Sequence, residues 1–445
     1  MGTRFNLFVQ PPIEGSRNET EIITVSSPLG SVAAGPSDDR MYVVEPVGKN
    51  FPYGSNLGPL GTPFIYLPPW TGKTRAPAVP DERGNFDHYH PGDPGFQAAH
   101  VFGAVRFTLD VWERYLGQKV VWHFDDHFGR LEISLLPQWN NAQYGYGYLE
   151  IGSHIQDRRK IAAFALDFDV IAHEIGHAIV YGVLGVPGAG TEYPEYLGFH
   201  ESFSDCVSLI AAMHFPSVIA GVLEQTHGNL NRENRLARFS EFAPHRQLRR
   251  ANNRRTMAEF AYQYKDEHVL SQPLTGAIFD ILSDIFHENL VEHGLISREV
   301  ENLADIAEHD SAADLMVQRV FDRAFASDTV GFRDSLKAAR DTVGTYLAET
   351  LWGLGADFLD YGDVARAFLA TDKVLNQGRY SSIIRRNFAQ RGIGRFHAGK
   401  RAAGKQQDGH AHSDRILLPT DLRRLPAMSY RETYILSKII QGQHN

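Results

Sequence analysis

The sequence predicts an α+β fold, with a β-rich N-terminal part, a central helix and a mainly α-helical C-terminal domain. Residues 1–92 are rich in proline and glycine and hold short β-prone runs at Glu21–Val25 and Met41–Val44. Segment 166–185, LDFDVIAHEIGHAIVYGVLG, is apolar on most faces, as expected of a central helix. Beyond residue 255 nearly every stretch has the apolar spacing of helices of ten to twenty residues.

The elements between these parts can also be placed along the chain. Phe96–Leu116 has apolar residues at helical spacing and ends at a glycine, which predicts a helix. Val120–Phe124 and Leu131–Leu135 resemble strands, and the aromatic, glycine-rich run NNAQYGYGYLEIG follows them. A helix over roughly 199–215 carries FHESFSDCVSLIAAMHF, after a glycine- and proline-rich end of the central helix.

At 445 residues the chain is long enough for two or three domains. The composition shifts suggest four parts, ending in a polar tail of low complexity that we expect to be flexible. They are a β-rich segment 1–92, an α/β part 93–185, a mainly helical domain 186–395 and the tail 396–445.

Charge and hydropathy narrow the possible partners and the compartment. The net charge of −9 argues against nucleic acid or an anionic membrane surface as the main partner. The sequence has no stretch of eighteen or more apolar residues, so we expect no membrane span. The N-terminal residues MGTRFNLFVQPPIEG hold no apolar run like that of a signal peptide, so we expect a cytoplasmic protein. The oligomeric state cannot be read from the sequence.

The central helix carries the strongest chemical signal. His173, Glu174 and His177 spell HEIGH, and positions i and i+4 of a helix share one face. Both imidazoles can therefore point at one metal ion. Glu174 is offset from His173 by about 100°, beside the ion, where a general base for a metal-activated water belongs.

A carboxylate on the following helix completes this pattern. Glu201 lies 24 residues after His177 (201 − 177) and could act as a third protein ligand. Three ligands leave one coordination position open for water, as catalytic zinc requires. Asp205 lies one turn further on, suited to hydrogen-bond the outer nitrogen of a ligand histidine. A nearby cation explains this acidic pair better than a solvated surface does.

Three runs in this order, NNAQYGYGYLEIG, LDFDVIAHEIGHAIV and HESFSD, resemble the thermolysin family of gluzincin metallopeptidases. The resemblance covers residues 86–395 and is strongest over 138–210. It implies a thermolysin-like zincin fold, a Zn²⁺ cofactor and a peptide or protein substrate.

Residue by residue, the resemblance implies the same three zinc ligands and the same general base. Asp205 would orient His173. Asn141 and the carbonyl of Ala142 would hold the substrate backbone along an edge strand.

The resemblance also suggests groups that stabilise the developing oxyanion. The family has a tyrosine shortly before the glutamate ligand, and Tyr193 and Tyr196 both lie near that place, with Tyr193 preferred. His268 would stabilise the same charge, and Arg238 would bind a substrate carbonyl. Ordinary packing or surface roles explain Tyr193, His268 and Arg238 equally well.

These features favour zinc-dependent hydrolysis of a peptide bond by a metal-activated water, with Glu174 as general base. The substrate would be a restricted peptide or protein, because the chain lacks the signal and propeptide segments of secreted members. Two alternatives stay open: a zinc amidohydrolase acting on a non-peptide small molecule, and a gluzincin-fold protein that binds without cleaving. Cleavage specificity and endo- versus exopeptidase action are also open.

Overall fold

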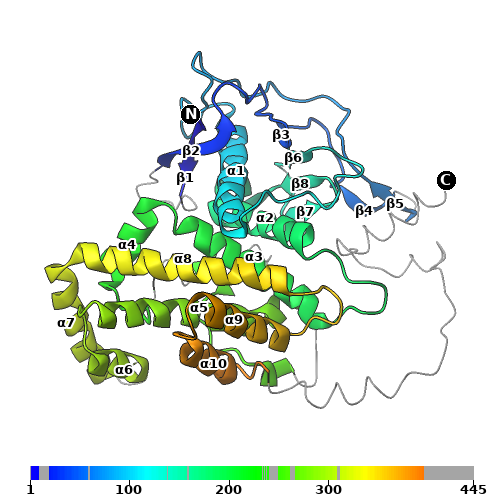
Figure 1. Cartoon of the computed structure of the whole chain (residues 1–445). Helices are drawn as coiled ribbons and strands as arrows, with labels where there is room; N and C mark the ends of the chain where they lie inside the picture. The colour runs from blue at the N-terminus through cyan, green and yellow to red at the C-terminus, as the bar shows by residue number, and fades with distance from the viewer. Residues whose placement is uncertain are drawn as a thin grey trace, which may run out of the picture. The chain divides into compact units, whose positions relative to one another are not determined.

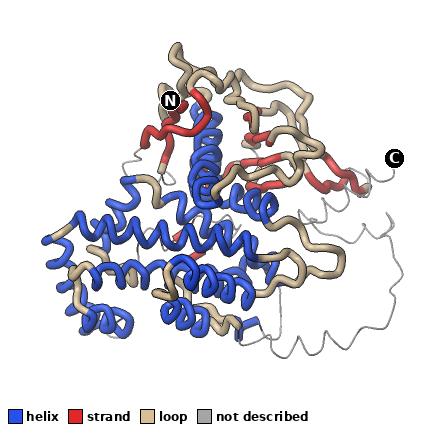
Figure 2. The backbone as a smooth tube through the Cα atoms, in the orientation of Figure 1, coloured by secondary structure: helices blue, strands red, loops and turns tan. Residues whose placement is uncertain are grey.

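The computed structural model describes residues 2–9, 20–58, 61–137, 139–157, 160–232, 234, 236, 238–239, 249–260, 266–307 and 311–394. They form two compact units, one with most of the strands and one built of helices (Figures 1 and 2). Unit 1 takes its described residues from Met1–Phe107 and Val121–Gly182. Unit 2 takes them from Thr108–Val120 and Val183–His397. The predicted tail 396–445 lies outside the described residues, and the predicted four-part division stays a prediction.

Unit 1 holds a four-stranded sheet with the strand order β3–β6–β8–β7. Its strands are β3 (Met41–Val44), β6 (Leu131–Leu135), β8 (Tyr148–Ile151) and β7 (Ala142–Gly145). β3, β6 and β8 run parallel, and β7 returns antiparallel to β8 through a two-residue turn at Tyr146 and Gly147. Gly147 has a φ of +90°, which glycine adopts without strain. β7 is therefore an edge strand.

The rest of unit 1 consists of hairpins and two helices. Phe5 of the first strand stacks on Phe102 of the first helix at 5.5 Å, and Gly103 permits this approach because a Cβ there would lie 2.8 Å from the Cβ of Phe5. The hairpins pair β1 (Gly2–Phe8) with β2 (Thr20–Pro28), β4 (Gly54–Leu57) with β5 (Pro63–Tyr66), and β9 (Ser153–Asp157) with β10 (Lys160–Ala163). The helices are α1 (Phe96–Leu116), whose last turns belong to unit 2, and α2 (Phe168–Val183).

Two buried glutamates tie the sheet of unit 1 to the loop before β4. Glu150 of β8 pairs with the Nζ of Lys49 at 2.6 Å, and both side chains are at most 1% exposed. Glu132 of β6 accepts from the hydroxyl of Tyr53 at 2.7 Å. Gln143 of β7 donates to Glu150 at 2.7 Å, so the network also holds the edge strand. Burial raises the pKa of Glu150 and lowers the pKa of Lys49, and their mutual attraction opposes both shifts.

Unit 2 is a helical domain built around one long helix, α5. α5 contacts α3, α8 and α10, and most of its residues are buried. Gly198 of α3 permits a close approach to Tyr361, whose hydroxyl would lie 2.2 Å from an added Cβ. The helices are α3 (Pro194–Ala212), α4 (Pro216–Thr226), α5 (Glu267–Glu292), α6 (Arg298–Ala307), α7 (Ser311–Ser327), α8 (Thr329–Gly353), α9 (Tyr361–Leu375) and α10 (Ser381–Gln390). The short strands β11 (Arg238–Phe239) and β12 (Arg249–Arg250) pair with each other.

α5 is long and apolar enough to cross a membrane by length and composition, as are α3 and α4 taken as a pair bent by 94°. However, 83% of the most apolar window of α5 is buried inside the structure. α5 is therefore best described as a core helix.

The structure confirms the α+β class and most predicted elements. The predicted helix Phe96–Leu116 and the predicted strands Met41–Val44 and Leu131–Leu135 have the observed bounds. The helix predicted from residue 199 starts earlier, because Pro194 occupies its first turn after Tyr193.

The strand predicted at Val120–Phe124 is wrong. Val120, Trp122 and Phe124 are buried and Val121 is 61% exposed, so the alternation in the sequence is real. The backbone nevertheless forms turns, with Asp125 N–H donating to the carbonyl of Trp122, instead of pairing with a strand.

Candidate metal centre

The HEIGH motif forms the polar face of α2. Between Val170 and Tyr181 of this helix, only His173, Glu174 and His177 are half-buried, while the other residues are buried. The rings of His173 and His177 lie 4.9 Å apart between centroids and meet at 85°. The i and i+4 spacing has thus brought the two imidazoles together on one face.

Glu174 is held by the edge strand of unit 1. The backbone N–H of Tyr144 in β7 donates to Oε2 of Glu174 at 2.7 Å. The two residues that flank a two-residue hairpin turn form a hydrogen-bonded backbone pair, and in β7 and β8 these are Gly145 and Tyr148. Hydrogen-bonded and non-hydrogen-bonded pairs alternate along an antiparallel ladder, so every second residue of β7 turns its N–H and C=O away from β8. Ala142 and Tyr144 are these outward residues.

The outward backbone of Ala142 is consistent with the predicted substrate-binding position. Ala142 is half-buried, and Asn141 before it is exposed. The carbonyl of Asn141 accepts from the N–H of Gly152 and therefore faces β8. The side chain of Asn141, rather than its carbonyl, is the group left to face a ligand on this edge.

In unit 2, α3 carries the predicted glutamate ligand. Glu201 is 7% exposed and Asp205 is 3% exposed. Thr275 of α5 donates from its hydroxyl to the hydroxyl of Ser202 at 3.0 Å and, more weakly, to Asp205 at 3.4 Å. The predicted orientation of His173 by Asp205 stays a prediction.

His268 lies against the predicted glutamate ligand. It is the second residue of α5, and its Nδ1 lies 2.8 Å from Oε2 of Glu201. Asp266 caps this helix by accepting from the N–H of His268 at 2.8 Å, which fixes the start of α5. The side chain of His268 is 46% exposed, so one side of the ring can meet a ligand.

His173, His177 and Glu201 form a group that could hold a metal ion. Each offers one ligand atom, and these atoms all lie within 4.8 Å of one another. Two imidazoles and one carboxylate suit zinc, and they leave a coordination position open. Ferrous iron also accepts two histidines and a carboxylate, so the donor set alone does not choose between these metals.

The environments of the two candidate tyrosines differ. Tyr196 is fully buried, and its hydroxyl donates to the carbonyl of Gly185 at 2.7 Å. Tyr193 is 37% exposed and packs edge-on against Phe358 at 5.5 Å. Tyr193 therefore has the more accessible hydroxyl, in line with the preference drawn from the sequence.

Arg238 lies in the short strand β11, opposite Arg250, and its side chain is outside the described part of the structure. Its predicted contact with a substrate carbonyl stays a prediction.

Sequence reasoning missed two contacts that join the site residues to one another. The N–H of Tyr144 reaches Glu174 from 30 residues away, and His268 reaches Glu201 from 67 residues away. A backbone donor leaves no mark in the sequence. The His268–Glu201 pair would have needed the packing of α5 on α3 to be known.

Comparisons with known proteins give little to set beside this geometry. No family model matches the chain, and no curated protein matches it. Among solved structures the chain is similar to the precursor of protealysin, a metalloproteinase from Serratia proteamaculans. The identity is 13%, the TM-score is 0.43, and the match covers 83% of this chain and 90% of that one. At this distance the function has to be argued from the side chains of the site.

Proposed function

We propose that the protein is a zinc-dependent peptidase of the thermolysin-like, gluzincin type, acting on an extended peptide or protein segment. The observation that carries the proposal is the grouping of His173, His177 and Glu201 within 4.8 Å. Glu174 beside them makes this more than a structural metal site, because a structural zinc has no use for an adjacent carboxylate base.

A zinc ion held by these three residues would supply Lewis-acid chemistry and lower the pKa of a water molecule to about 7. The protein residues supply the remaining tasks. Glu174 takes the proton from the attacking water and returns it to the leaving amine. The Tyr144 N–H, 2.7 Å from its Oε2, holds the carboxylate in one orientation while it does so.

The edge strand supports a peptide as the substrate. The outward N–H and C=O of Ala142 can pair with an extended chain as a further strand would, which gives affinity independent of the side chains. Asn141 would add a hydrogen bond from its amide. Tyr193 and His268 would donate to the oxyanion, and one such donor is typically worth about 3–4 kcal/mol in the transition state.

The direct test is incubation of the full chain with a diverse peptide library, with and without a chelator, read by mass spectrometry. We expect cleavage that stops on metal removal and returns with zinc. Elemental analysis of the purified protein should find about one zinc per chain. Cleavage that persists after the metal is removed would contradict the proposal.

Glu174→Gln is the sharper variant, because it keeps the size and the hydrogen-bonding shape of the side chain. We expect turnover to fall by roughly 10²–10⁴-fold while zinc content stays unchanged. His177→Gln is the matched control one turn further along α2, and it should lose zinc and activity together. Near-normal turnover of Glu174→Gln would show that Glu174 is not the general base.

The same samples separate the two alternatives. Zinc binding without peptide cleavage, but with hydrolysis of small amides, would identify an amidohydrolase. If the protein binds zinc and peptides but hydrolyses neither peptides nor small amides, it is a binding protein.

A further inference from the structure

A pocket of about 420 Å³ opens in unit 1, between the loop that follows β3 and the loop that follows β6. Its volume lies in the range of small-molecule sites in proteins. Most of its lining side chains are apolar, and the polar ones are Lys49, Asn50 and Arg75. The apolar walls include Val47, Phe51, Pro52, Leu136, Pro137 and Trp139.

The Trp139 wall of the pocket continues directly into the edge strand β7. The carbonyl of Trp139 accepts from the N–H of Ser153 at 2.8 Å, and the carbonyl of Asn141 accepts from the N–H of Gly152 at 2.9 Å. The chain from Trp139 to Gly145 therefore follows one border of the sheet without a break.

The opposite wall, the loop 46–52, is also held to the sheet. Lys49 pairs with Glu150 of β8 at 2.6 Å, and the carbonyl of Tyr53 accepts from Nε2 of Gln143 in β7 at 3.1 Å. The pocket and the edge strand are thus fixed relative to each other before any ligand binds. A preorganised surface of this kind loses little conformational freedom on binding.

Apolar side chains at the pocket are left in water. Val47 is 48% exposed and Phe51 is 39% exposed. Phe51 packs edge-on against Phe64 of β5 at 5.5 Å, and Phe64 is itself 37% exposed. Single exposed apolar side chains are common, but a group of them around a hollow is typical of an interaction surface. The lining therefore favours an apolar group of a ligand.

Arg75 gives the pocket a positive charge. Its side chain is exposed and makes no hydrogen bond or ion pair with the described residues. Glu45 lies near it, since the charge of Arg75 opposes the rise that burial causes in the pKa of Glu45. However, Arg75 lines the pocket and Glu45 does not. A basic side chain that entered would meet a like charge first.

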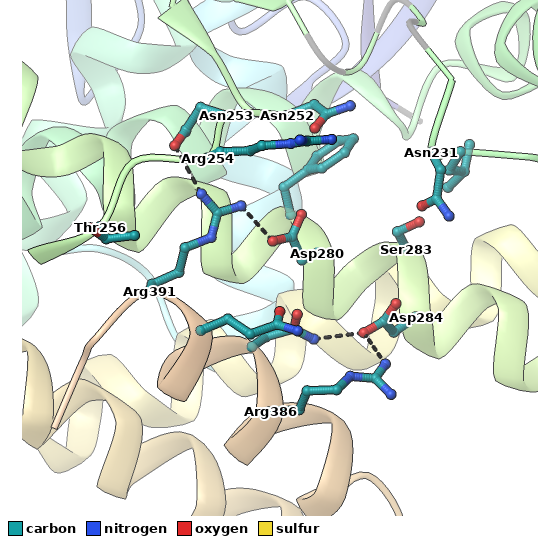
Figure 3. Close-up of a pocket in the computed structure, with 14 residues that line it drawn as sticks. Asn231, Asn252, Asn253, Arg254, Thr256, Asp280, Ser283, Asp284, Arg386 and Arg391 are labelled. Atoms are coloured by element: carbon teal, nitrogen blue, oxygen red, sulfur yellow. Dashed lines mark hydrogen bonds and ion pairs between the residues drawn. The ribbon is translucent and has the colours of Figure 1, made fainter. Parts of the chain in front are cut away.

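A cavity of about 320 Å³ in unit 2, between α5, α10 and two loops, has walls of a different kind (Figure 3). Asp280 pairs there with Arg391 at 2.5 Å, and Asp284 pairs with Arg386 at 2.7 Å. Arg254 adds a third guanidinium group, and several amides lie between these groups. Such mixed walls do not favour one class of ligand, whereas the apolar walls of the pocket in unit 1 do.

An extended peptide on β7 would reach the pocket in unit 1. Tyr144, whose N–H donates to Glu174, lies five residues after Trp139 (144 − 139). At 3.4 Å per residue this separation is roughly 17 Å along the edge. A peptide that is cleaved beside Glu174 would therefore have a residue about five places from the cleaved bond next to Trp139.

We propose that this pocket binds a bulky apolar side chain of the peptide substrate, about five residues from the cleaved bond. Phe51 and Trp139 provide ring contacts for that side chain. The inference rests on the proposed peptidase function and names its substrate class more closely. The substrate is an extended segment with a large apolar residue, and not a basic one, at a set distance from the metal centre.

The test uses alanine peptides with a hydroxamate group at one end, which chelates zinc and fixes the register of the peptide. One series has this group at the amino end and the other at the carboxyl end, so both chain directions are covered. Phenylalanine is moved one place at a time, and binding to the full zinc-loaded chain is measured by fluorescence anisotropy. We expect about tenfold tighter binding than for alanine alone when phenylalanine is about four to six places from the hydroxamate in one series.

Variants at the exposed side chains locate this gain. Phe51→Ala should lose most of it, because one wall of the pocket is gone. Val47→Asp adds a carboxylate at a position 48% exposed and should make lysine bind better than phenylalanine at the same place. The matched control is Ile22→Ala in β2, which removes an apolar side chain 61% exposed outside the pocket and should bind as the wild type does.

The outcomes separate this inference from the proposed function. If the alanine hydroxamates do not bind at all, the proposed function fails and the inference fails with it. If they bind but phenylalanine gives no gain at any place, the inference alone is overturned. It is also overturned if lysine gives the wild type the same gain, or if Phe51→Ala and Val47→Asp both keep the gain from phenylalanine.

Discussion

The two units bury charge in different ways. In unit 1, Lys49 and Glu150 are 1% and 0% exposed, so both ends of the ion pair have left water. In unit 2, the comparable pair of Arg386 and Asp284 has side chains 43% and 11% exposed, beside an open cavity.

The difference shows which charges belong to the framework. The attraction within a desolvated pair at best roughly offsets the cost of taking both charges out of water, but removing one partner leaves an uncompensated buried charge. A pair with one end in solvent loses little when it is broken, because water replaces the partner. The Lys49 network supports β7, whereas Arg386 keeps much of its side chain in solvent.

The largest effect is expected when the buried pair is broken. Lys49→Met keeps the length of the side chain but leaves Glu150 without its cation. We expect the free energy of unfolding to fall by about 3–5 kcal/mol, measured by urea titration. Adding Glu150→Gln should restore much of the loss, because the buried charge is then gone. If Lys49→Met costs no more than the cavity variant Arg386→Ala, the contrast between the units does not hold.

An acid titration tests a second kind of buried group in unit 1, a titratable side chain that is not part of an ion pair. His100 is fully buried, and desolvation lowers its pKa to about 4 from the ordinary 6.5. Between these values the unfolded chain takes up a proton and the folded chain does not, so stability falls as the pH drops from 6.5 to 4. The loss at pH 4 is about 3 kcal/mol, since each pKa unit corresponds to 1.36 kcal/mol.

His100→Gln should flatten this part of the curve of unfolding free energy against pH. His88→Gln changes an exposed ring in the same unit and should leave the slope as in the wild type. An unchanged slope in His100→Gln would assign the acid sensitivity to other groups.

The smallest effect is expected at the cavity. Arg386→Ala should lower the free energy of unfolding by less than about 1 kcal/mol, because the arginine is exposed and Asn387 still donates to Asp284. The effect should shrink further at 1 M salt, whereas that of Lys49→Met should not. A loss near 3 kcal/mol would mean that the Arg386–Asp284 pair supports the fold as the Lys49 pair does.

Much of the fold could be predicted because it follows from local spacing. Phe96–Leu116 repeats its apolar residues at the helical period, and β3 (MYVV) and β6 (LEISL) are short, mainly apolar runs, so their bounds agree with the structure. The alternation at Val120–Phe124 misled, because buried residues two apart occur in a loop packed on the core as well as in a strand.

The site divides in the same way. The sequence alone determined that His173, Glu174 and His177 share a helix face, because four residues make about one turn of any α-helix. Only the tertiary structure decided that Glu201 meets the two histidines, that Tyr144 holds Glu174 and that His268 reaches Glu201. These contacts join residues 24 to 67 positions apart, and chain spacing cannot set such distances, because the intervening turns and the packing of α5 on α3 bring the side chains together.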